Sequence, residues 1–390
     1  MNLRHGSLFS GYGGLDIAIE EVFGARTAWV SDVDKGACKV LAHRYPGVPN
    51  LGDITAVDWS TVEPVDLISG GSPCQDLSHA GKRGGMTEGT RSNLWVAMRE
   101  AIAQLRPTYV IWENVRGAYS AAADSDVEPC PGCVGDGPGV HLRALGRVLG
   151  DLSDLGYMGG WHGLRAADVG APHGRFRVFV VARLAAADTL GERRGERRLA
   201  APGQAPGGRA SAVDRGRGGA PVALLPTPVT TDAKGHSAGD LRRHSPGLRT
   251  LSALLPTPRA TDGTKGGPNQ RGSSDVEGGR KHRSGARSDE LLLNGIAAAD
   301  RWGQYADAIA RWEHVSGRPA PEPTEPTGRG GAPRLSPAFT EWLMGLPAGW
   351  ITDVPGITRN EALKLCGNGV VPQQAITALR EITSWTEAAA

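Results

Sequence analysis

The stretch RHGSLFSGYGGLDIAIE, residues 4–20, decides the fold class of this chain. Residues 4–9 are typical of a short strand, residues 10–14 of a glycine-rich turn, and residues 15–20 have the apolar spacing of a helix. A strand, a glycine turn and a helix in this order open a Rossmann-like unit, so the sequence predicts an α/β fold. By itself the turn also fits a dinucleotide-binding enzyme or a merely tight connection.

A cysteine follows another expected strand. Residues 65–69 form a mostly apolar run that predicts a buried strand, and the segment GGSPCQ, residues 70–75, comes directly after it. Cys74 therefore stands where a sheet delivers side chains to a ligand. We interpret Cys74 as a candidate nucleophile, and the alternative is a buried structural cysteine.

Acidic residues stand at the ends of other expected strands. Asp32 follows the second strand, where a carboxylate can accept hydrogen bonds from ribose hydroxyls. Asp53 and Ile54 offer a second carboxylate and an apolar side chain near the same edge of the sheet. Glu113 ends the strand expected at residues 108–112 and could supply the proton chemistry that a thiolate mechanism needs. Each acid could instead be an ordinary solvated surface group.

Length and composition favour a globular protein. The chain has 390 residues, enough for one large domain and a smaller one, and no apolar run approaches membrane-spanning length. Its first residues lack the charged and apolar parts of a signal peptide, so we expect a cytoplasmic location. Five widely spread cysteines favour thiols over a disulfide framework.

The middle of the chain differs in composition from the rest. Residues 193–287 contain 18 Lys and Arg against 7 Asp and Glu, so they carry a net charge of +11 in a chain whose total is +2. No Phe, Trp or Tyr occurs in residues 184–301, and the pentapeptide LLPTP occurs at 224–228 and again at 254–258. The charge indicates a polyanion-binding region, or alternatively an arginine-rich solvated linker. The repeat fits two similar turns or two extended anchors on the rest of the protein.

Five motifs in order resemble those of the C5-cytosine DNA methyltransferases. They are FSGYGG at 9–14, GSPCQ at 71–75, ENV at 113–115, GRFRV at 174–178 and GNGV at 367–370. The resemblance covers about residues 4–183 and 335–385. It implies a Rossmann-like methyltransferase domain that uses S-adenosyl-L-methionine and acts as a DNA (cytosine-5-)-methyltransferase.

The resemblance also implies a mechanism. Cytosine C5 is a poor nucleophile, so the thiolate of Cys74 would first add to C6, while Glu113 would hold and protonate N3. The target base must swing out of the duplex, which costs a few kcal/mol. Arg175 and Arg177 would contact the base or its phosphates and help keep Cys74 ionised.

Further site residues follow from the same resemblance. The cofactor-binding residues would be Phe9, Ser10, Gly11, Gly13, Gly14, Leu15, Asp32, Asp53, Ile54, Pro73, Leu94, Asn368 and Val370. The DNA-contacting residues would be Gln75, Ser78, Lys82, Arg83 and Asn114, with the loop 76–93 closing over the substrate. A terminal helix, residues 373–386, would cover the flank of the sheet beside the glycine turn. Two positions depart from the family pattern: His173 replaces a common Gln, and Val33 replaces a large residue that often packs on adenine.

The expected domains are a catalytic domain, residues 1–183 plus 335–390, and a basic target-recognition region, residues 184–334. Within that region, residues 291–312 are expected to be helical and residues 319–333 to be a Pro- and Gly-rich linker. Cys130 and Cys133 have the spacing of two zinc ligands, but a metal site needs four, so the alternative is a Gly/Pro-rich surface loop.

Several partners are expected on the same grounds. Double-stranded DNA is the substrate, a cognate restriction endonuclease is a candidate companion, and a monomer is the default because each chain carries one site. The location would be the cytoplasm of a bacterium or of a phage-infected host. Two alternative functions stay open: cytosine-5 methylation of RNA such as tRNA, and DNA binding by a catalytically silent relative.

Overall fold

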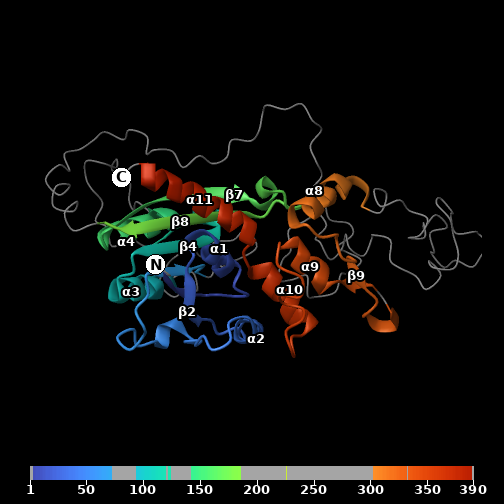
Figure 1. The fold of residues 1–390 in the computed structure, drawn as a ribbon, viewed down its shortest axis with the longest axis horizontal. Helices are drawn as coiled ribbons and strands as arrows, with labels where there is room; N and C mark the ends of the chain where they lie inside the picture. Colours follow the sequence, from blue (N-terminus) through green and yellow to red (C-terminus); the bar gives the residue numbers. More distant parts are fainter. Residues whose placement is uncertain are drawn as a thin grey trace, which may run out of the picture.

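The computed structural model describes residues 3–72, 94–119, 122–123, 142–185, 225, 302–331 and 333–388. In this part of the chain, six strands form one sheet in the spatial order β2-β1-β3-β4-β8-β7 (Figure 1). The strands are β1 (Arg4–Leu8), β2 (Arg26–Ser31), β3 (Leu67–Gly70), β4 (Tyr109–Val115), β7 (Tyr157–Arg165) and β8 (Phe176–Leu184). Strands β1 to β4 are parallel, whereas β8 pairs antiparallel with both β4 and β7.

The strand order reverses at β1, which lies between β2 and β3. From β1 the chain crosses through α1 (Gly14–Phe23) to β2 on one side, and β3 then joins β1 on the other side. Ligands of open α/β sheets bind in the crevice beyond the C-terminal strand ends at such a point. The fold therefore directs a binding site to residues 9–14 and 71–72, which follow β1 and β3.

The sheet is buried on both faces because successive side chains of a strand point to opposite sides. Trp112 of β4 joins one buried cluster with α3 (Leu94–Leu105) and α4 (Ala144–Asp154). Ile111, its neighbour, joins another cluster with α1 and α11 (Pro372–Ala388) (Figure 1). A sheet between two helical layers confirms the predicted α/β, Rossmann-like fold.

A third buried cluster unites α2 with helices from the C-terminal part of the chain (on the right in Figure 1). Within it, the indole nitrogen Nε1 of Trp312 donates to the carbonyl of Trp342 at 2.8 Å. The helices are α2 (Lys35–Arg44), α8 (Ala306–Ser316), α9 (Pro337–Leu343) and α10 (Arg359–Asn368). The shorter elements are η1 (Ile54–Ala56), η3 (Arg116–Tyr119), η4 (Ala166–Val169), η8 (Gly303–Tyr305), η9 (Arg329–Gly331), and the pairs β5 (Ala122–Ala123) with β6 (Leu142–Arg143) and β9 (Thr324–Glu325) with β10 (Arg334–Leu335).

Several sequence predictions of local structure are confirmed and others need correction. The terminal helix is confirmed as α11, which packs on α1 and on β7. Residues 291–301 of the helix predicted for 291–312 lie outside the described residues. The C-terminal bound of that helix is wrong, because a 3-10 turn at 303–305 is followed by α8, which continues to Ser316 before Gly317 ends it in a left-handed conformation. The predicted linker 319–333 contains β9, which pairs with β10. Glu113 lies within β4 instead of after the strand, because β8 pairs with this segment up to Val115.

Leu225 belongs to the first LLPTP repeat and is held by residues 172–173, which precede β8. Its amide donates to the carbonyl of Pro172 at 2.6 Å, and it forms a parallel bridge with His173. Its side chain is buried in the same cluster as Trp302 and Phe339. These contacts favour the anchor interpretation for the first repeat, whereas the second repeat lies outside the described residues.

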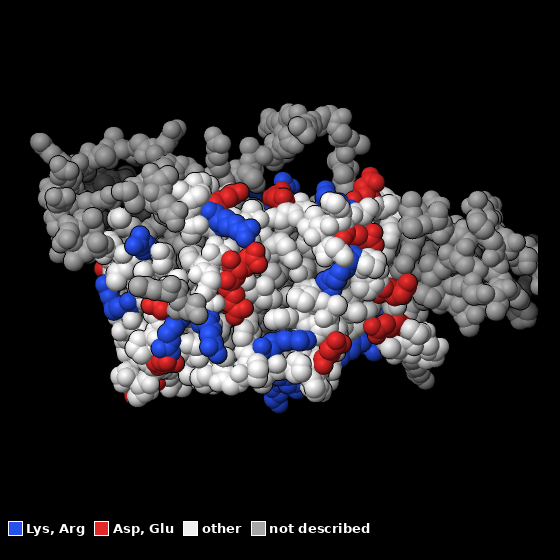
Figure 2. Space-filling model, in the orientation of Figure 1, with Lys and Arg blue, Asp and Glu red and all other residues white. Residues whose placement is uncertain are grey.

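Two further features of the described residues are the hydrophobicity of their helices and the distribution of their surface charge. None of the helices in this part of the chain is long and apolar enough to cross a membrane. On the face shown in Figure 2, Lys and Arg side chains are interspersed with Asp and Glu side chains. Apart from Leu225, the strongly basic residues 193–287 lie outside the described part.

Glu341 of α9 fixes the turn that follows the helix. Its buried carboxylate accepts hydrogen bonds from the backbone amides of Gly349 at 2.7 Å, Ile351 at 2.7 Å and Thr352 at 2.9 Å. This turn carries Trp350, whose Nε1 donates to the carbonyl of Tyr12 in the glycine turn at 2.7 Å. Through this turn, the carboxylate of Glu341 helps to hold Trp350 against the glycine turn that follows β1.

We predict that Glu341→Ala lowers the free energy of unfolding by about 3 kcal/mol, because two buried backbone amides and one part-buried amide lose their acceptor. Urea denaturation of the full chain measures this loss. The matched control is Glu21→Ala, which removes an exposed carboxylate paired with Arg380 and should change stability by less than about 0.5 kcal/mol. Equal losses in the two variants would contradict the role given to Glu341.

Candidate functional site

A pocket of about 660 Å³ lies beyond the C-terminal ends of β1 to β4. Predicted site residues that line it are Phe9, Ser10, Gly11, Gly14, Leu15, Asp32, Asp53, Ile54, Leu94, Glu113, Asn114, Arg177, Asn368 and Val370. Gly13 and Arg175 are described but do not line it. Pro73, Cys74, Gln75, Ser78, Lys82, Arg83, Cys130 and Cys133 lie outside the described residues. The pocket thus unites side chains from both ends of the chain.

The glycine turn at the pocket is tightly wound. Gly11 and Gly13 have φ angles of 58° and 83°, in the left-handed region that favours glycine, and Phe9 shares this region with φ 53°. A side chain at Gly14 would collide with the carbonyl of Val370 and the ring of Tyr12. Glycine at this position lets the C-terminal segment close directly on the start of α1.

Asp32 braces the glycine turn against the end of β2. Its carboxylate accepts hydrogen bonds from the amides of Gly11 and Asp34, each at 2.8 Å. Burial raises the pKa of Asp32, while these two amides lower it. Asp53 instead caps the short helix η1 and accepts from the amide of Thr55 at 2.9 Å, which lowers its pKa. Both carboxylates border the pocket.

Glu113 and Arg177 form a buried pair on the neighbouring strands β4 and β8. The Nε of Arg177 lies 2.6 Å from Oε1 of Glu113. Burial raises the pKa of Glu113, and the nearby Arg177 and Arg175 partly offset this shift. A Cβ atom added at Gly71 would lie 2.7 Å from Oε2 of Glu113. The segment that leads to Cys74 thus passes directly beside this carboxyl group.

Asn114 holds the backbone just before Pro73. Its side-chain amide donates to the carbonyl of Ser72 at 3.1 Å and to the Ser72 hydroxyl at 3.3 Å. Trp112 donates to the same hydroxyl at 3.1 Å. The structure places Asn114 almost fully buried beside Ser72, and its predicted contact with DNA stays a prediction.

The two predicted arginines have different surroundings. Arg175 donates to the carbonyls of Gly367 at 3.1 Å and Gly369 at 2.6 Å, so it ties β8 to the C-terminal motif. Arg177 alone of the two lines the pocket. His173, which departs from the family pattern, is fully buried and its Nε2 lies 3.0 Å from the carbonyl of Leu343. Burial lowers the pKa of His173 to about 3, so its ring is neutral.

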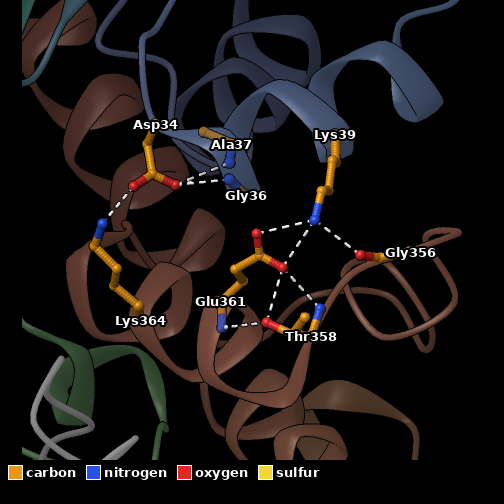
Figure 3. Close-up of polar contacts among 8 residues, drawn as sticks. All are labelled: Asp34, Gly36, Ala37, Lys39, Gly356, Thr358, Glu361 and Lys364. Atoms are coloured by element: carbon orange, nitrogen blue, oxygen red, sulfur yellow. Dashed lines mark hydrogen bonds and ion pairs between the residues drawn. The ribbon is translucent and has the colours of Figure 1, made fainter.

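Two ion pairs join α2 to α10 beside the pocket (Figure 3). Asp34 caps α2 by accepting from two backbone amides at 2.9 and 3.2 Å, and it also pairs with Lys364. Lys39 lies 2.9 Å from Oε1 of Glu361, which belongs to a capping box at the start of α10. Asp34 and Lys364 both line the pocket, so this contact helps to define its edge.

Sequence reasoning missed several residues that line the pocket. Tyr12 was quoted only as part of the glycine turn, yet its hydroxyl donates to the carbonyl of Val370 at 2.6 Å. Lys364 of α10 also lines the pocket. The amphipathic pattern of α10 does not indicate that this helix borders a ligand site. Ser7 and Asp16 flank the glycine turn. Asp16 carried a signal, since an acid stands in the first turn of a helix among apolar residues.

The family comparison agrees with this geometry. Residues 3–202, about half of the chain, match the C-5 cytosine-specific DNA methylase family. The chain therefore belongs to this family, as the order of its motifs predicted.

Individual relatives match over part of their length. The chain is 32% identical over 184 residues to the type II methyltransferase M.AquIA of Picosynechococcus, and the match covers 45% of this chain and 69% of that protein. It is 30% identical over 177 residues to M.NgoFVII of Neisseria gonorrhoeae, with 45% and 42% covered. It is 38% identical over 132 residues to a protein of Escherichia phage P1 named DNA N-6-adenine-methyltransferase, with 31% and 17% covered. The chain thus spans less than half the length of the last two relatives.

Solved structures with a similar arrangement include the Dnmt2 methyltransferase of S. pombe. That structure is 13% identical, has a TM-score of 0.48, and the comparison covers 97% of this chain and 98% of that chain. A putative DNA modification methyltransferase encoded within an E. coli prophage is 17% identical with a TM-score of 0.46, and 98% and 100% are covered.

We predict that Gly71→Ala destabilises the protein by about 1–3 kcal/mol, because the new methyl group overlaps the carboxyl group of Glu113. Gly150→Ala is the matched control: it lies in α4 with open space around it, and should stabilise the protein by about 0.5–1 kcal/mol. Thermal and urea unfolding measure both. A stable Gly71→Ala protein would contradict the close approach of residue 71 to Glu113.

We predict that Glu361→Gln destabilises the protein at neutral pH but not in acid. Hydrogen bonds from Lys39 and Thr358 lower the pKa of Glu361 from 4.5 to about 2. Because the folded state holds the ionised form, the stabilisation is present above pH 4.5 and is lost as the pH falls toward about 2. Melting temperatures of the wild type and the variant should converge over this interval, and a constant difference would exclude the ion pair as its cause.

Proposed function

We propose that this protein transfers a methyl group from S-adenosyl-L-methionine to carbon 5 of a cytosine in duplex DNA. The observation that carries the proposal is the buried pair of Glu113 and Arg177, which lines the pocket beside Gly71. Membership of the C-5 cytosine-specific DNA methylase family supports this assignment. The matched relatives extend beyond the shared segment, so the activity of the whole protein stays a proposal.

The pocket fits the proposed methyl donor. Its lining residues follow β2, β1, β3 and β4. These strands are separated by three spacings of about 4.8 Å each, so the pocket spans about 14 Å across the sheet. Asp32 would hold the ribose, Asp53 and Ile54 would border the adenine, and the amides of the glycine turn would face the amino acid end. Val33 lines the pocket and is exposed, but its small side chain offers the adenine less packing surface than the large residue that is common in the family. S-adenosyl-L-methionine supplies an electrophilic methyl group when bound.

Cys74 is the proposed nucleophile, two residues beyond the Ser72 that Asn114 holds. Its thiolate adds to C6 of cytosine, which breaks the C5–C6 double bond and makes C5 nucleophilic. Carbon 5 would then take the methyl group as the sulfur–methyl bond breaks and S-adenosylhomocysteine leaves. A base would remove the C5 proton, and elimination of Cys74 would restore the ring as 5-methylcytosine. Each bond formed to Cys74 is therefore broken again within one cycle.

Glu113 is the proposed partner of cytosine N3. Its pKa is raised by burial, which favours retention of a proton that it can give to N3 as the thiolate adds. Arg177 keeps the carboxyl group oriented at 2.6 Å and limits this rise. Arg175 would act through the C-terminal motif, since its guanidinium binds two carbonyls there.

DNA binding is assigned mainly to the basic middle region. The net charge of +11 over residues 193–287 suits contacts to phosphates, whereas charges of both signs are interspersed on the described face shown in Figure 2. The target cytosine would have to leave the duplex to reach the pocket. A catalytic domain of residues 1–183 plus 335–390, a recognition region of residues 184–334, a monomeric state, a cytoplasmic location and a companion restriction endonuclease belong to the same proposal.

The covalent step predicts trapping on 5-fluorocytosine. A fluorine atom at C5 cannot leave as the proton does, so the bond from Cys74 to C6 should persist after methyl transfer. Long duplex DNA of random sequence, synthesised with 5-fluorodeoxycytidine in place of deoxycytidine, contains every short site. A denaturing gel should show a slower complex only when the methyl donor is present. Cys74→Ser is the matched control. No Cys74-dependent complex would contradict the mechanism.

We expect the protein to methylate duplex DNA and not RNA. Labelled methyl groups should enter duplex DNA and not tRNA under matched conditions. Labelling of tRNA alone would favour the RNA alternative, and labelling of neither would favour a silent DNA-binding relative.

A further inference from the structure

Asp16 is a buried acid that the proposed mechanism does not use. It lies in the first turn of α1, directly after the glycine turn, and it lines the pocket together with Ser7. The residue is fully buried, and both carboxyl oxygens lack a hydrogen-bond partner among the described residues. An isolated buried carboxylate is costly, so a ligand that supplies a donor would remove a penalty already present.

The surroundings of Asp16 are neutral or acidic. The Ser7 hydroxyl from β1 is near enough to lower its pKa, although no hydrogen bond of regular geometry reaches either oxygen. Burial raises this pKa most, to about 7, and Glu20 from α1 and Asp32, which follows β2, also raise it. Tyr45 follows α2. Burial raises the pKa of its phenol, the charge of Asp16 raises it further, and the hydroxyl has no hydrogen-bond partner among the described residues. The acid therefore sits in a place suited to a cation.

The other acidic side chains that line the pocket have partners. Glu113 pairs with Arg177 at the β4 side, and Asp34 pairs with Lys364 at the α2 side. Asp32 accepts two backbone amides. Asp16 lies between these two sides, because α1 follows β1 and β1 lies between β2 and β3.

The amino acid end of S-adenosyl-L-methionine carries a carboxylate and an α-ammonium group. Backbone amides at a helix N-terminus suit the carboxylate, but they repel the ammonium. We propose that Asp16 is the acceptor for this α-ammonium group, which places a positioning residue for the methyl donor on the first turn of α1. This assignment rests on the proposed function, since it requires the methyl donor in this pocket.

The test compares two ligands and three proteins. The ligands are S-adenosylhomocysteine and its analogue with hydrogen in place of the α-ammonium group. Isothermal titration of the wild-type chain should show about ten- to a hundred-fold tighter binding of the parent ligand, the range for a charge-assisted hydrogen bond. In Asp16→Asn this preference should fall to about one- to three-fold. In Glu20→Gln, an acid one turn further along α1 that does not line the pocket, it should stay as in the wild type.

A second readout separates positioning from structure. Asp16→Asn removes a buried charge without changing the shape of the side chain, so the ligand-free melting temperature should stay equal or rise, while the increase caused by S-adenosylhomocysteine should shrink. Wild-type preference for the parent ligand should also grow as the pH rises from about 6 to about 8, because Asp16 must ionise, and this slope should vanish in Asp16→Asn.

The outcomes are distinguishable. If the wild type binds neither ligand, the proposed function fails and the assignment of Asp16 fails with it. If the wild type binds S-adenosylhomocysteine but Asp16→Asn keeps the full preference over the desamino analogue, the role of Asp16 is overturned and the proposed function stands. A lower ligand-free melting temperature in Asp16→Asn, with unchanged preference, would make Asp16 a structural residue.

Discussion

The hydrogen bond from the Tyr12 hydroxyl to the carbonyl of Val370, 2.6 Å long, closes the site. It joins residues 358 positions apart and brings the end of the chain onto the glycine turn. Two further contacts act in the same direction: Trp350 donates to the carbonyl of Tyr12, and Arg175 donates to the carbonyls of Gly367 and Gly369. Without this closure, the pocket would have no wall from α10 and the segment that leads into α11.

The remaining site follows from where parallel strands end. The order of β2, β1, β3 and β4 arranges Asp32, the glycine turn, Gly71 and Glu113 along one edge of the sheet. Small residues keep this edge open: a side chain at Gly14 would meet Val370, and one at Gly71 would meet Glu113. The family pattern of glycines thus has a steric explanation in this chain.

The sequence predicted the parts of the fold that depend on local pattern. The terminal helix and the first two strands could be recognised because apolar spacing and glycine turns mark them. The start of α8 was missed because Gly303 and a 3-10 turn interrupt an otherwise helical pattern. The role of Arg175 could not be found, since its carbonyl partners lie almost 200 residues away. Asp16 was missed for a related reason: only the folded chain shows that its carboxyl group has no partner among the described residues.

Methylation of cytosine in DNA by this protein is tested most directly by sequencing of modified bases. The full chain would be expressed in a bacterial host that lacks cytosine methylation of its own, beside a Cys74→Ser version. We expect 5-methylcytosine at one recurring short sequence in the DNA of the first host and none at that sequence in the second. Absence of 5-methylcytosine from both hosts, or methylation confined to adenine N6, would contradict the account.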